Sequence, residues 1–225
     1  MFKIIEMLLK RSLYLLYFLL SFFVSNAQKN EANTSPKKVV LSGGIGGAMF
    51  QFSSVEFSGF KFKSIPRFSY FFNTGVDINF HVFKQVTPFT GFQLRNIGII
   101  LKPTDSIKTK ERIYTIGAPL GVKYYLKDKK SFVAAGADIG LAFNYKYKLF
   151  YNGEKNYKEN EFFSNNTSLM QSSVFVGTSL KGVAVYLNYY LNNFYSNSLS
   201  SKKANLLIVS LNFDIDKKTI QSKVK

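Results

Sequence analysis

The sequence lacks cysteine and tryptophan, and it holds a single histidine, His81, among its 225 residues. The absence of cysteine excludes disulfides, thiolate metal sites, a cysteine nucleophile and a lipidated N-terminal cysteine. A single histidine excludes a metal centre built from several histidines. Only 19% of the residues are charged and 46% are hydrophobic, so wholesale disorder is also excluded. What the chain does contain is 24 Phe and 14 Tyr, which is ample material for β-structure.

The first 27 residues have the pattern of a secretory signal peptide. A basic start that ends at Arg11 is followed by the uncharged segment 12–24 and by small residues around Ala27. The uncharged segment has thirteen residues, fewer than the roughly 20 that a membrane-spanning helix needs. We therefore expect cleavage after Ala27 and export of the mature chain. The mature chain would carry 27 Lys and Arg against 12 Asp and Glu, a net charge of +15.

Alternation with a period of two residues dominates the rest of the chain. A strand can place every second residue on one face, whereas a helix cannot. The clearest case is 68–83, where one face is apolar and the other is mostly small or polar. A bulge after Leu94 would swap the faces of the third strand, and 57–62 could extend the first hairpin. The pattern predicts eight strands: 39–52, 68–83, 88–101, 113–126, 132–147, 169–180, 183–194 and 205–213.

The connections between these strands alternate in length. Three are predicted as short turns: 84–87, 127–131 and 181–182. Four are predicted as long loops: 53–67, 102–112, 148–168 and 195–204. All long loops therefore fall at one end of an up-and-down meander, an asymmetry typical of outer-membrane barrels. We divide the chain into a signal peptide (1–27), a polar leader (28–38), an eight-stranded antiparallel up-and-down transmembrane β-barrel (39–213) and a basic tail (214–225).

The distribution of charge predicts which face of the strands points outward. The eight predicted strands hold 107 residues and only five charges, whereas the other 91 mature residues hold 34. A water-facing strand surface would be about a quarter to a third charged. A soluble lipocalin-like barrel would also alternate, but with its apolar face inward. The scarcity of charge favours a barrel whose apolar face meets lipid and whose small and polar residues fill the interior.

Several stretches resemble outer-membrane β-barrel proteins of the Bacteroidetes, in particular the small OmpX/PorT-like barrels. The stretches are 95–98, 114–121, 143–146 and 173–177, together with the Ser-Asn-Ala-Gln junction at 25–28. The resemblance covers roughly 39–214 and implies a fold and an outer-membrane location. It carries no catalytic residue. The chain departs from the pattern in one respect, because twelve residues follow Phe213, where barrels often end on a terminal aromatic residue.

The five strand charges are predicted to lie inside the barrel: Asp77, Arg95, Lys123, Asp138 and Lys146. If 85–87 form the first turn, Asp77 faces Arg95 across the hairpin and forms an ion pair with it. Lys123 and Asp138 lie on neighbouring strands, and we expect them to pair diagonally. Charges in a narrow lumen must be paired, so the structural role of these residues is favoured over a conduction path.

Three further features have a structural and a functional interpretation. His81 is predicted at the interior near the periplasmic end and lacks a partner base or nucleophile, so packing is favoured over catalysis. The glycines of 43–47 superficially resemble a phosphate loop but lack its lysine and helix, so a curved strand explains them better. Asp105-Ser106-Ile107 resembles an acceptor motif for O-glycosylation, although three residues are weak evidence.

The largest predicted loop, 148–168, mixes charges with aromatic residues. Such a mixture suits contact with a protein or a glycan, and it equally suits a hairpin that extends above the membrane. The candidate contact residues are Tyr151, Lys155, Tyr157, Lys158, Phe162 and Phe163. The basic loops also favour attraction to lipopolysaccharide, although loop solubility explains the charge as well.

These observations lead to one functional expectation with two alternatives. We expect a non-enzymatic outer-membrane barrel, without cofactor or metal, with a structural or binding role through its loops. The expected partners are outer-membrane lipid, lipopolysaccharide, the barrel-assembly machinery and a protein or glycan ligand, but not nucleic acid. The alternatives are an accessory component of a secretion or motility machine and a narrow channel.

Overall fold

The chain folds into antiparallel β-structure, as a computed structural model describes it for residues 38–43, 46–70, 73–127, 131–180, 182–196, 201–213 and 216–220. The predicted signal peptide, the predicted polar leader up to residue 37 and residues 221–225 lie outside the described residues. Thirteen strands belong to one sheet. They are β1 (Lys38–Ser42), β2 (Gly46–Phe57), β3 (Phe60–Phe62), β4 (Arg67–Ser69), β5 (Thr74–His81), β6 (Val86–Leu101), β7 (Ile107–Tyr125), β8 (Phe132–Tyr151), β9 (Glu154–Phe162), β10 (Met170–Leu180), β11 (Val183–Tyr190), β12 (Lys202–Phe213) and β13 (Asp216–Ile220).

The order of the strands differs from the predicted ring of eight. Hydrogen-bonded neighbours follow the order β13-β1-β5-β6-β7-β8-β10-β11-β12-β2-β3, while β4 also pairs with β2 and β9 with β8. This order does not return to its start, so the prediction of eight strands in a closed ring is wrong as stated. Apart from β9, the strands from β5 to β12 are hydrogen-bonded neighbours in chain order and follow the predicted meander. Among the described residues, no helix is long and apolar enough to cross a membrane.

The extra strands arise because β1 and β2 share the first predicted strand, β4 and β5 share the second, and β3, β9 and β13 form in segments predicted as loops or tail. A turn at Ser58 and Gly59, both with positive φ, separates β2 from β3. Pro66 lies between β3 and β4 and has no backbone N–H to donate to a ladder. The sequence left open whether 57–62 extends the first hairpin, and the pairing of β3 with β2 shows that it does. Part of the predicted tail is also a strand, because β13 pairs with β1.

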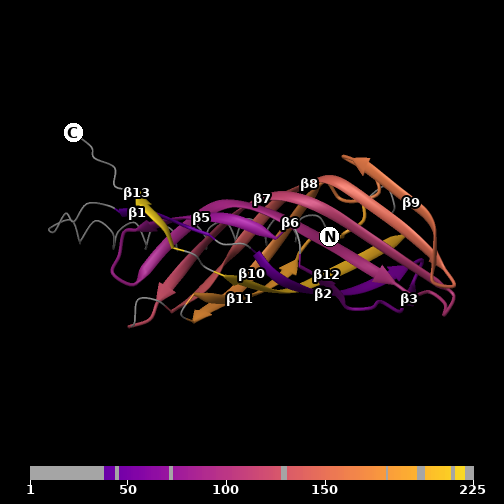
Figure 1. Cartoon of the computed structure of the whole chain (residues 1–225), viewed down its shortest axis with the longest axis horizontal. Helices are drawn as coiled ribbons and strands as arrows, with labels where there is room; N and C mark the ends of the chain where they lie inside the picture. Colours follow the sequence, from indigo (N-terminus) through magenta and orange to yellow (C-terminus); the bar gives the residue numbers. More distant parts are fainter. Residues whose placement is uncertain are drawn as a thin grey trace, which may run out of the picture. The chain divides into compact units, whose positions relative to one another are not determined.

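Residues predicted as long loops mostly continue the strands. The segment 107–112 belongs to β7, and most of 148–162 forms the end of β8 and the whole of β9. Continuation is favoured because each added residue pairs its backbone groups. We call residues 107–114, 144–151 and β9 the arm. Figure 1 shows the arm at the right, where β9 lies along β8.

The two faces of the sheet have opposite character, as the sequence predicts. On β7 and β8 the outward side chains are apolar and exposed, and Leu120 and Ile139 have exposed fractions of 71% and 54%. The residues between them are buried and often polar, and Lys123 is only 1% exposed. We call the exposed apolar residues the outer band. Its members on the central strands include Ile116, Leu120, Val122, Tyr124, Val133, Ile139, Val174, Val176, Leu180, Val183, Val185, Leu187 and Tyr189.

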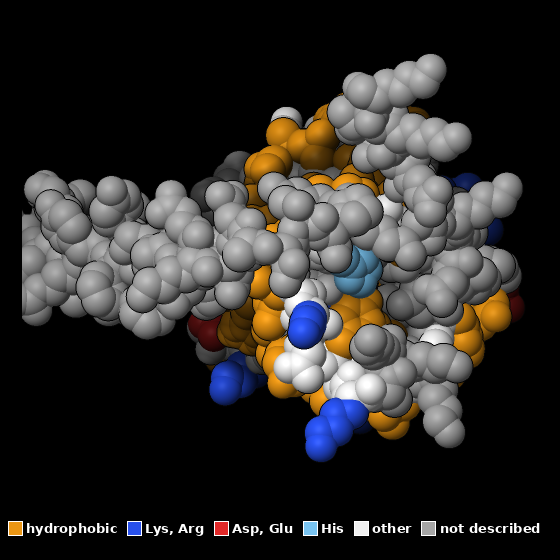
Figure 2. Space-filling model, turned by 90° about the vertical axis from the view of Figure 1, so that its left-hand side faces the viewer, with side chains coloured by type: hydrophobic (Ala, Val, Ile, Leu, Met, Phe, Trp, Pro, Cys, Tyr) orange, Lys and Arg blue, Asp and Glu red, His pale blue; other side chains and the backbone are white. Residues whose placement is uncertain are grey.

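The inner face has an apolar part near the arm and a polar part near the short turns. The apolar part is a packed cluster that includes Met49, Val55, Ile97, Ile99, Ile113, Tyr145, Phe194, Tyr195, Leu206 and Ile208. The polar part includes Asn79, Thr87, Lys123, Asp138, Ser173 and Asn188, all buried. Figure 2 looks onto the end with the short turns, where hydrophobic side chains and scattered Lys or Arg side chains are visible.

Close approach of strands depends on glycines that face one another on the inner side. Gly121 and Gly136 are opposite each other in the pairing of β7 with β8. A Cβ on Gly136 would lie 2.4 Å from the Leu120 carbonyl oxygen and 2.6 Å from the Phe175 ring. Phe89 and Phe175 stack over this pair with ring centroids 6.0 Å apart. The glycines therefore make room for the inner aromatic residues.

Gly136→Val should lower the free energy of unfolding by about 1–3 kcal/mol, because the added carbons overpack the inner face. Ala135→Val, one residue away on the outer face, is the matched control and should change it little. The difference is measured as the urea concentration at the midpoint of unfolding in detergent micelles. Unfolding is monitored by the gel mobility of unboiled samples. Equal midpoints for the two variants would contradict the close contact.

Candidate functional site: the inner polar residues and the arm

Lys123 is the most deeply buried charge on the inner face. Its Nζ donates to Asp77 Oδ2 at 2.8 Å and to Asn79 Oδ1 at 2.9 Å. The ammonium group also lies 4.6 Å from the centroid of the Phe89 ring and 5.1 Å from that of Phe132. Two acceptors and two ring faces replace the water that a buried ammonium loses.

Arg95 forms a second ion pair deeper toward the middle of the inner face. Its Nη1 lies 2.7 Å from Asp138 Oδ2. The same nitrogen is 3.3 Å from Asn188 Oδ1 and 3.4 Å from Tyr190 Oη, and Nη2 donates to Gln93 Oε1. The guanidinium therefore joins β6 to β8 and β11, which are not hydrogen-bonded neighbours of β6.

The predicted pairings of these charges are wrong, although four of the five residues do lie on the inner face. Asp77 faces Gly91 rather than Arg95, because the turn between β5 and β6 is centred nearer to residue 84. Each ion pair instead reaches across an intervening strand: Asp77 on β5 pairs with β7, and Arg95 on β6 pairs with β8. Curvature brings such second neighbours together on the inner face.

Lys146 is the exception, because it lies on the outer face. The ladder between β7 and β8 shifts register where Tyr114 and Thr115 oppose Asn144 and Ala142, so Phe143 is an extra residue. An extra residue in one strand inverts the faces of everything beyond it. Tyr145 is consequently buried, and Lys146 lies 5.0 Å from the centroid of the Tyr114 ring. The bulge anticipated after Leu94 is absent, since the pairing of β6 with β7 keeps one register from Val86 to Leu101.

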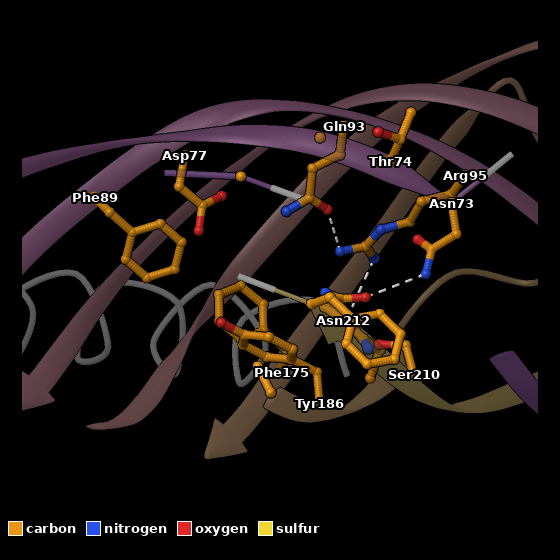
Figure 3. Close-up of a pocket in the computed structure, with 15 residues that line it drawn as sticks. Asn73, Thr74, Asp77, Phe89, Gln93, Arg95, Phe175, Tyr186, Ser210 and Asn212 are labelled. Carbon is orange, nitrogen blue, oxygen red and sulfur yellow. Dashed lines mark hydrogen bonds between the residues drawn. The ribbon is translucent and has the colours of Figure 1, made fainter. Parts of the chain in front are cut away.

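A small cavity of about 70 Å³ lies beside the Arg95 ion pair. Figure 3 shows Gln93 and Arg95 on one side of it and Phe175, Tyr186 and Asn212 on the other. Polar groups on its wall, including Asn73 Nδ2 and Asn212 Oδ1 at 3.3 Å, bond to each other. The space suits a few water molecules.

Asp77→Asn should lower the free energy of unfolding by about 3 kcal/mol or more, because it leaves the buried Lys123 ammonium without a counter-charge. The double variant Asp77→Asn, Lys123→Met should recover most of the loss, since it buries no charge. Urea unfolding of the wild-type protein, both single variants and the double variant measures the coupling. If the loss of stability in the double variant equals the sum of the losses in the two single variants, the ion pair is contradicted.

The segment 191–196, between β11 and β12, folds inward at the arm end. Phe194 and Tyr195 are 0% and 1% exposed, although 195 was predicted to begin an external loop. Ser168 Oγ donates to the Tyr195 carbonyl oxygen at 2.8 Å, and Asn193 Oδ1 accepts from Ala204 N at 2.7 Å. We call 191–196 the plug, because its aromatic side chains belong to the apolar cluster that fills this end.

Glu111 anchors the plug from β7. Its two carboxylate oxygens accept hydrogen bonds from Tyr145 Oη at 2.9 Å and Tyr195 Oη at 3.0 Å. Burial raises the pKa of Glu111, and this effect exceeds the opposing influence of Lys202 and of the two hydroxyl groups. Sequence reasoning missed Glu111 because it was assigned to a loop. The alternation of Lys110, Glu111 and Arg112 continues the period of the strand and could have revealed it.

The raised pKa of Glu111 predicts how stability depends on pH. The folded state holds the proton more tightly than the unfolded chain, so the contribution favours folding below the ordinary value of 4.5 and is lost as pH rises through the raised pKa. Relative to Glu111→Gln, the wild-type free energy of unfolding should therefore fall as the pH rises from below 4.5 through the raised pKa of Glu111. Urea unfolding of both proteins across this range measures the difference, and a constant difference would contradict the assignment.

Five of the six predicted contact residues of loop 148–168 lie on the arm rather than in a loop, and the sixth, Phe163, directly follows β9. All of them are exposed, and the exposed fractions of Tyr151, Tyr157, Phe162 and Phe163 are 52%, 51%, 70% and 58%. Tyr157 packs against Tyr147 with ring centroids 6.1 Å apart. Lys155 and Lys158 are exposed on β9. The residues thus share one projecting element but do not converge on a single pocket.

The remaining candidates have structural explanations. His81 Nδ1 is 3.2 Å from Thr87 Oγ1, and its ring lies 6.0 Å from Tyr125. A Cβ on Gly43 or Gly47 would lie 2.5 Å or less from a carbonyl oxygen of the adjacent strand, which explains these glycines by close packing. Asp105 is highly exposed and pairs with Lys102 at 2.8 Å. No group of three acidic or histidine residues suited to a metal occurs in the described part of the chain.

Comparisons with known proteins give a distant resemblance of fold. No protein-family model matches the chain, and no curated protein matches it. Among solved structures, Ail of Yersinia pestis is 9% identical with a TM-score of 0.35, and the match covers 80% of this chain and 100% of Ail. Neisserial surface protein A is 11% identical with a TM-score of 0.39, over 80% of this chain and 97% of that protein. The NanC porin is 10% identical with a TM-score of 0.26, over 79% and 100%. These similarities concern the general arrangement of strands.

Proposed function

We propose that the protein is a non-enzymatic outer-membrane β-barrel that presents the arm as a surface for binding. The observation that carries the proposal is the reversed polarity of the sheet, with buried ion pairs inside and the outer band outside. A contiguous exposed apolar surface of this kind marks contact with lipid or with another apolar surface. A sheet can span lipid only if every strand edge is paired, which a closed barrel achieves.

The pairing registers support closure of the sheet. β12 and β13 pair in succession with β2 and β1, with Lys202 opposite Phe57 and Ile220 opposite Val39. On its other side, β2 pairs with β3 and β4, and β1 pairs with β5. If β1 and β2 act as one strand of the wall, that strand has partners on both sides. The thirteen strands then group into eight segments of chain around a closed wall.

The length of the outer band fits a membrane. On β7 and at its end the exposed apolar residues run from Ile116 to Leu126, ten residues apart, which is about 33 Å along a strand. A strand tilt of about 40° reduces this to a height of about 25 Å, the height of the apolar band on membrane barrels. The arm continues β7 and β8 beyond this band.

The plug argues against the alternative in which the protein is a narrow channel. Phe194 and Tyr195 occupy the arm end of the inner face, within the apolar cluster, and an interior of this size leaves little space around side chains. An accessory role in a secretion or motility machine remains a prediction, and the arm is the surface that could serve that role. Export with cleavage after Ala27 is part of the proposal and follows from the signal-peptide pattern.

Single cysteines test the membrane assignment, since the chain has no other thiol. Ile139→Cys lies on the outer band, and Ala134→Cys, 6% exposed in the native protein, lies on the inner face of the same strand. Each is labelled with an environment-sensitive fluorophore and reconstituted in vesicles with brominated lipid. We expect brominated lipid to quench the label at position 139 strongly and the label at position 134 weakly.

Two outcomes would contradict the proposal. Equal quenching at the two positions would show that the faces do not separate lipid from interior. Recovery of the expressed protein in a soluble fraction, with no difference in gel mobility between boiled and unboiled samples, would show that the protein is not a membrane barrel. Val133→Cys, where the native side chain is 47% exposed at the other end of the band on β8, serves as a second outer position.

A further inference from the structure

The arm separates its charges by face. Cations occupy outward positions on its three strands, and the five nearest the outer band are Lys110 and Arg112 on β7, Lys146 and Lys148 on β8, and Lys158 on β9. Lys108 and Lys155 lie further out on the same face, both opposite Phe150. The registers place Arg112 opposite Lys146, Lys110 opposite Lys148, and Lys148 opposite Lys158. The five residues therefore form two adjacent rows, which we call the cation face.

The acidic residues of the same strands point the other way. Glu159 is opposite Tyr147 and Glu161 is opposite Tyr145, so both lie on the side of the buried Glu111. On the cation face, the neighbours on β9 are Asn160 and Phe162, which carry no charge. Among the described residues, none of the five cations lies within 4.0 Å of a carboxylate.

The cations contact aromatic rings and repel one another. Lys110 lies 4.9 Å from the centroid of Phe150, and Arg112 lies 5.7 Å from that of Tyr114. Partial burial followed by the charge of neighbouring cations lowers the pKa of Lys110, Lys146 and Lys148. Like charges opposite one another on a sheet are destabilising. An anion with more than one negative charge would relieve this repulsion.

The position of the cation face identifies the kind of anion. Arg112 lies four residues beyond Ile116, the last exposed apolar residue on β7, which is about 13 Å along the strand, and the Tyr114 ring between them lies beneath Arg112 and Lys146. The face therefore lies on the same side of the wall as the outer band, at the level of the lipid headgroups. Cations at this level attract anionic lipid rather than ligands that approach from above.

Resting on the proposed function, we propose that the cation face binds the phosphate groups of an anionic glycolipid in the external leaflet. Arg112 and Lys148 occupy the two rows at the centre of the face. Lys110, Lys146 and Lys158 surround them, so two phosphates carried on one sugar headgroup would each meet several cations. The acyl chains of the same lipid would lie against the outer band.

The test uses the protein in detergent micelles, titrated with bisphosphorylated lipid A and analysed by native mass spectrometry. Arg112→Gln combined with Lys148→Gln should weaken binding about 25-fold, at about fivefold for each cation removed near an anionic surface. Lys61→Gln combined with Lys203→Gln is the matched control, because both residues are exposed and both lie opposite Glu56. The control should bind like the wild-type protein. Each protein is first checked on a gel for a difference in mobility between boiled and unboiled samples, which shows that it is folded.

Three outcomes would overturn the inference. Equal binding by the Arg112, Lys148 variant and the control would exclude the cation face. Equal affinity for the deacylated bisphosphorylated disaccharide would show that the ligand is a soluble anion. Equal affinity of the wild-type protein for phosphatidylcholine would show that binding does not depend on the negative charge of the phosphates. Lipid quenching at positions 139 and 134 does not depend on these cations. If the cation face does not bind lipid A, the quenching experiment can therefore still support or contradict the membrane assignment.

Discussion

The narrow inner face requires every buried charge to find a partner, and this constraint shapes the wall. Lys123 and Arg95 each meet a carboxylate on a strand that is not a hydrogen-bonded neighbour. These contacts join strands across the interior, where hydrogen-bonded ladders cannot reach. The wall is thus held by two kinds of bond: backbone ladders around it and charged side chains across it.

The inner face also divides the protein into two functional levels. Near the short turns, polar side chains and a small cavity occupy the interior. Near the arm, Phe194 and Tyr195 fill it, and Glu111 holds Tyr195 and Tyr145. Glu111 therefore links the two segments, because it belongs to the arm and accepts a hydrogen bond from Tyr195 of the plug.

The arm combines this inward anchor with an outward cationic surface because a strand alternates its side chains. Glu111 lies between Lys110 and Arg112, so one strand supplies both the anchor and the cation face. Aromatic residues next to the cations, such as Tyr114 and Phe150, hold them against the sheet. A surface of this kind needs no pocket, because its ligand would also be held by the adjacent apolar band.

The sequence determined the alternation and therefore which residues face inward and outward over most of the wall. It placed Asp77, Arg95, Lys123 and Asp138 inside, because parity within an uninterrupted strand is a local property. It could not determine the partners, since those depend on a turn centred near residue 84 and on curvature that brings second-neighbour strands together. The bulge at Phe143, which only the pairing of β7 with β8 reveals, moved Lys146 to the outer face. Tertiary structure alone likewise decided that 107–112 and β9 form an arm and that Phe194 and Tyr195 turn inward, because these depend on which backbone groups and apolar surfaces find partners across the fold.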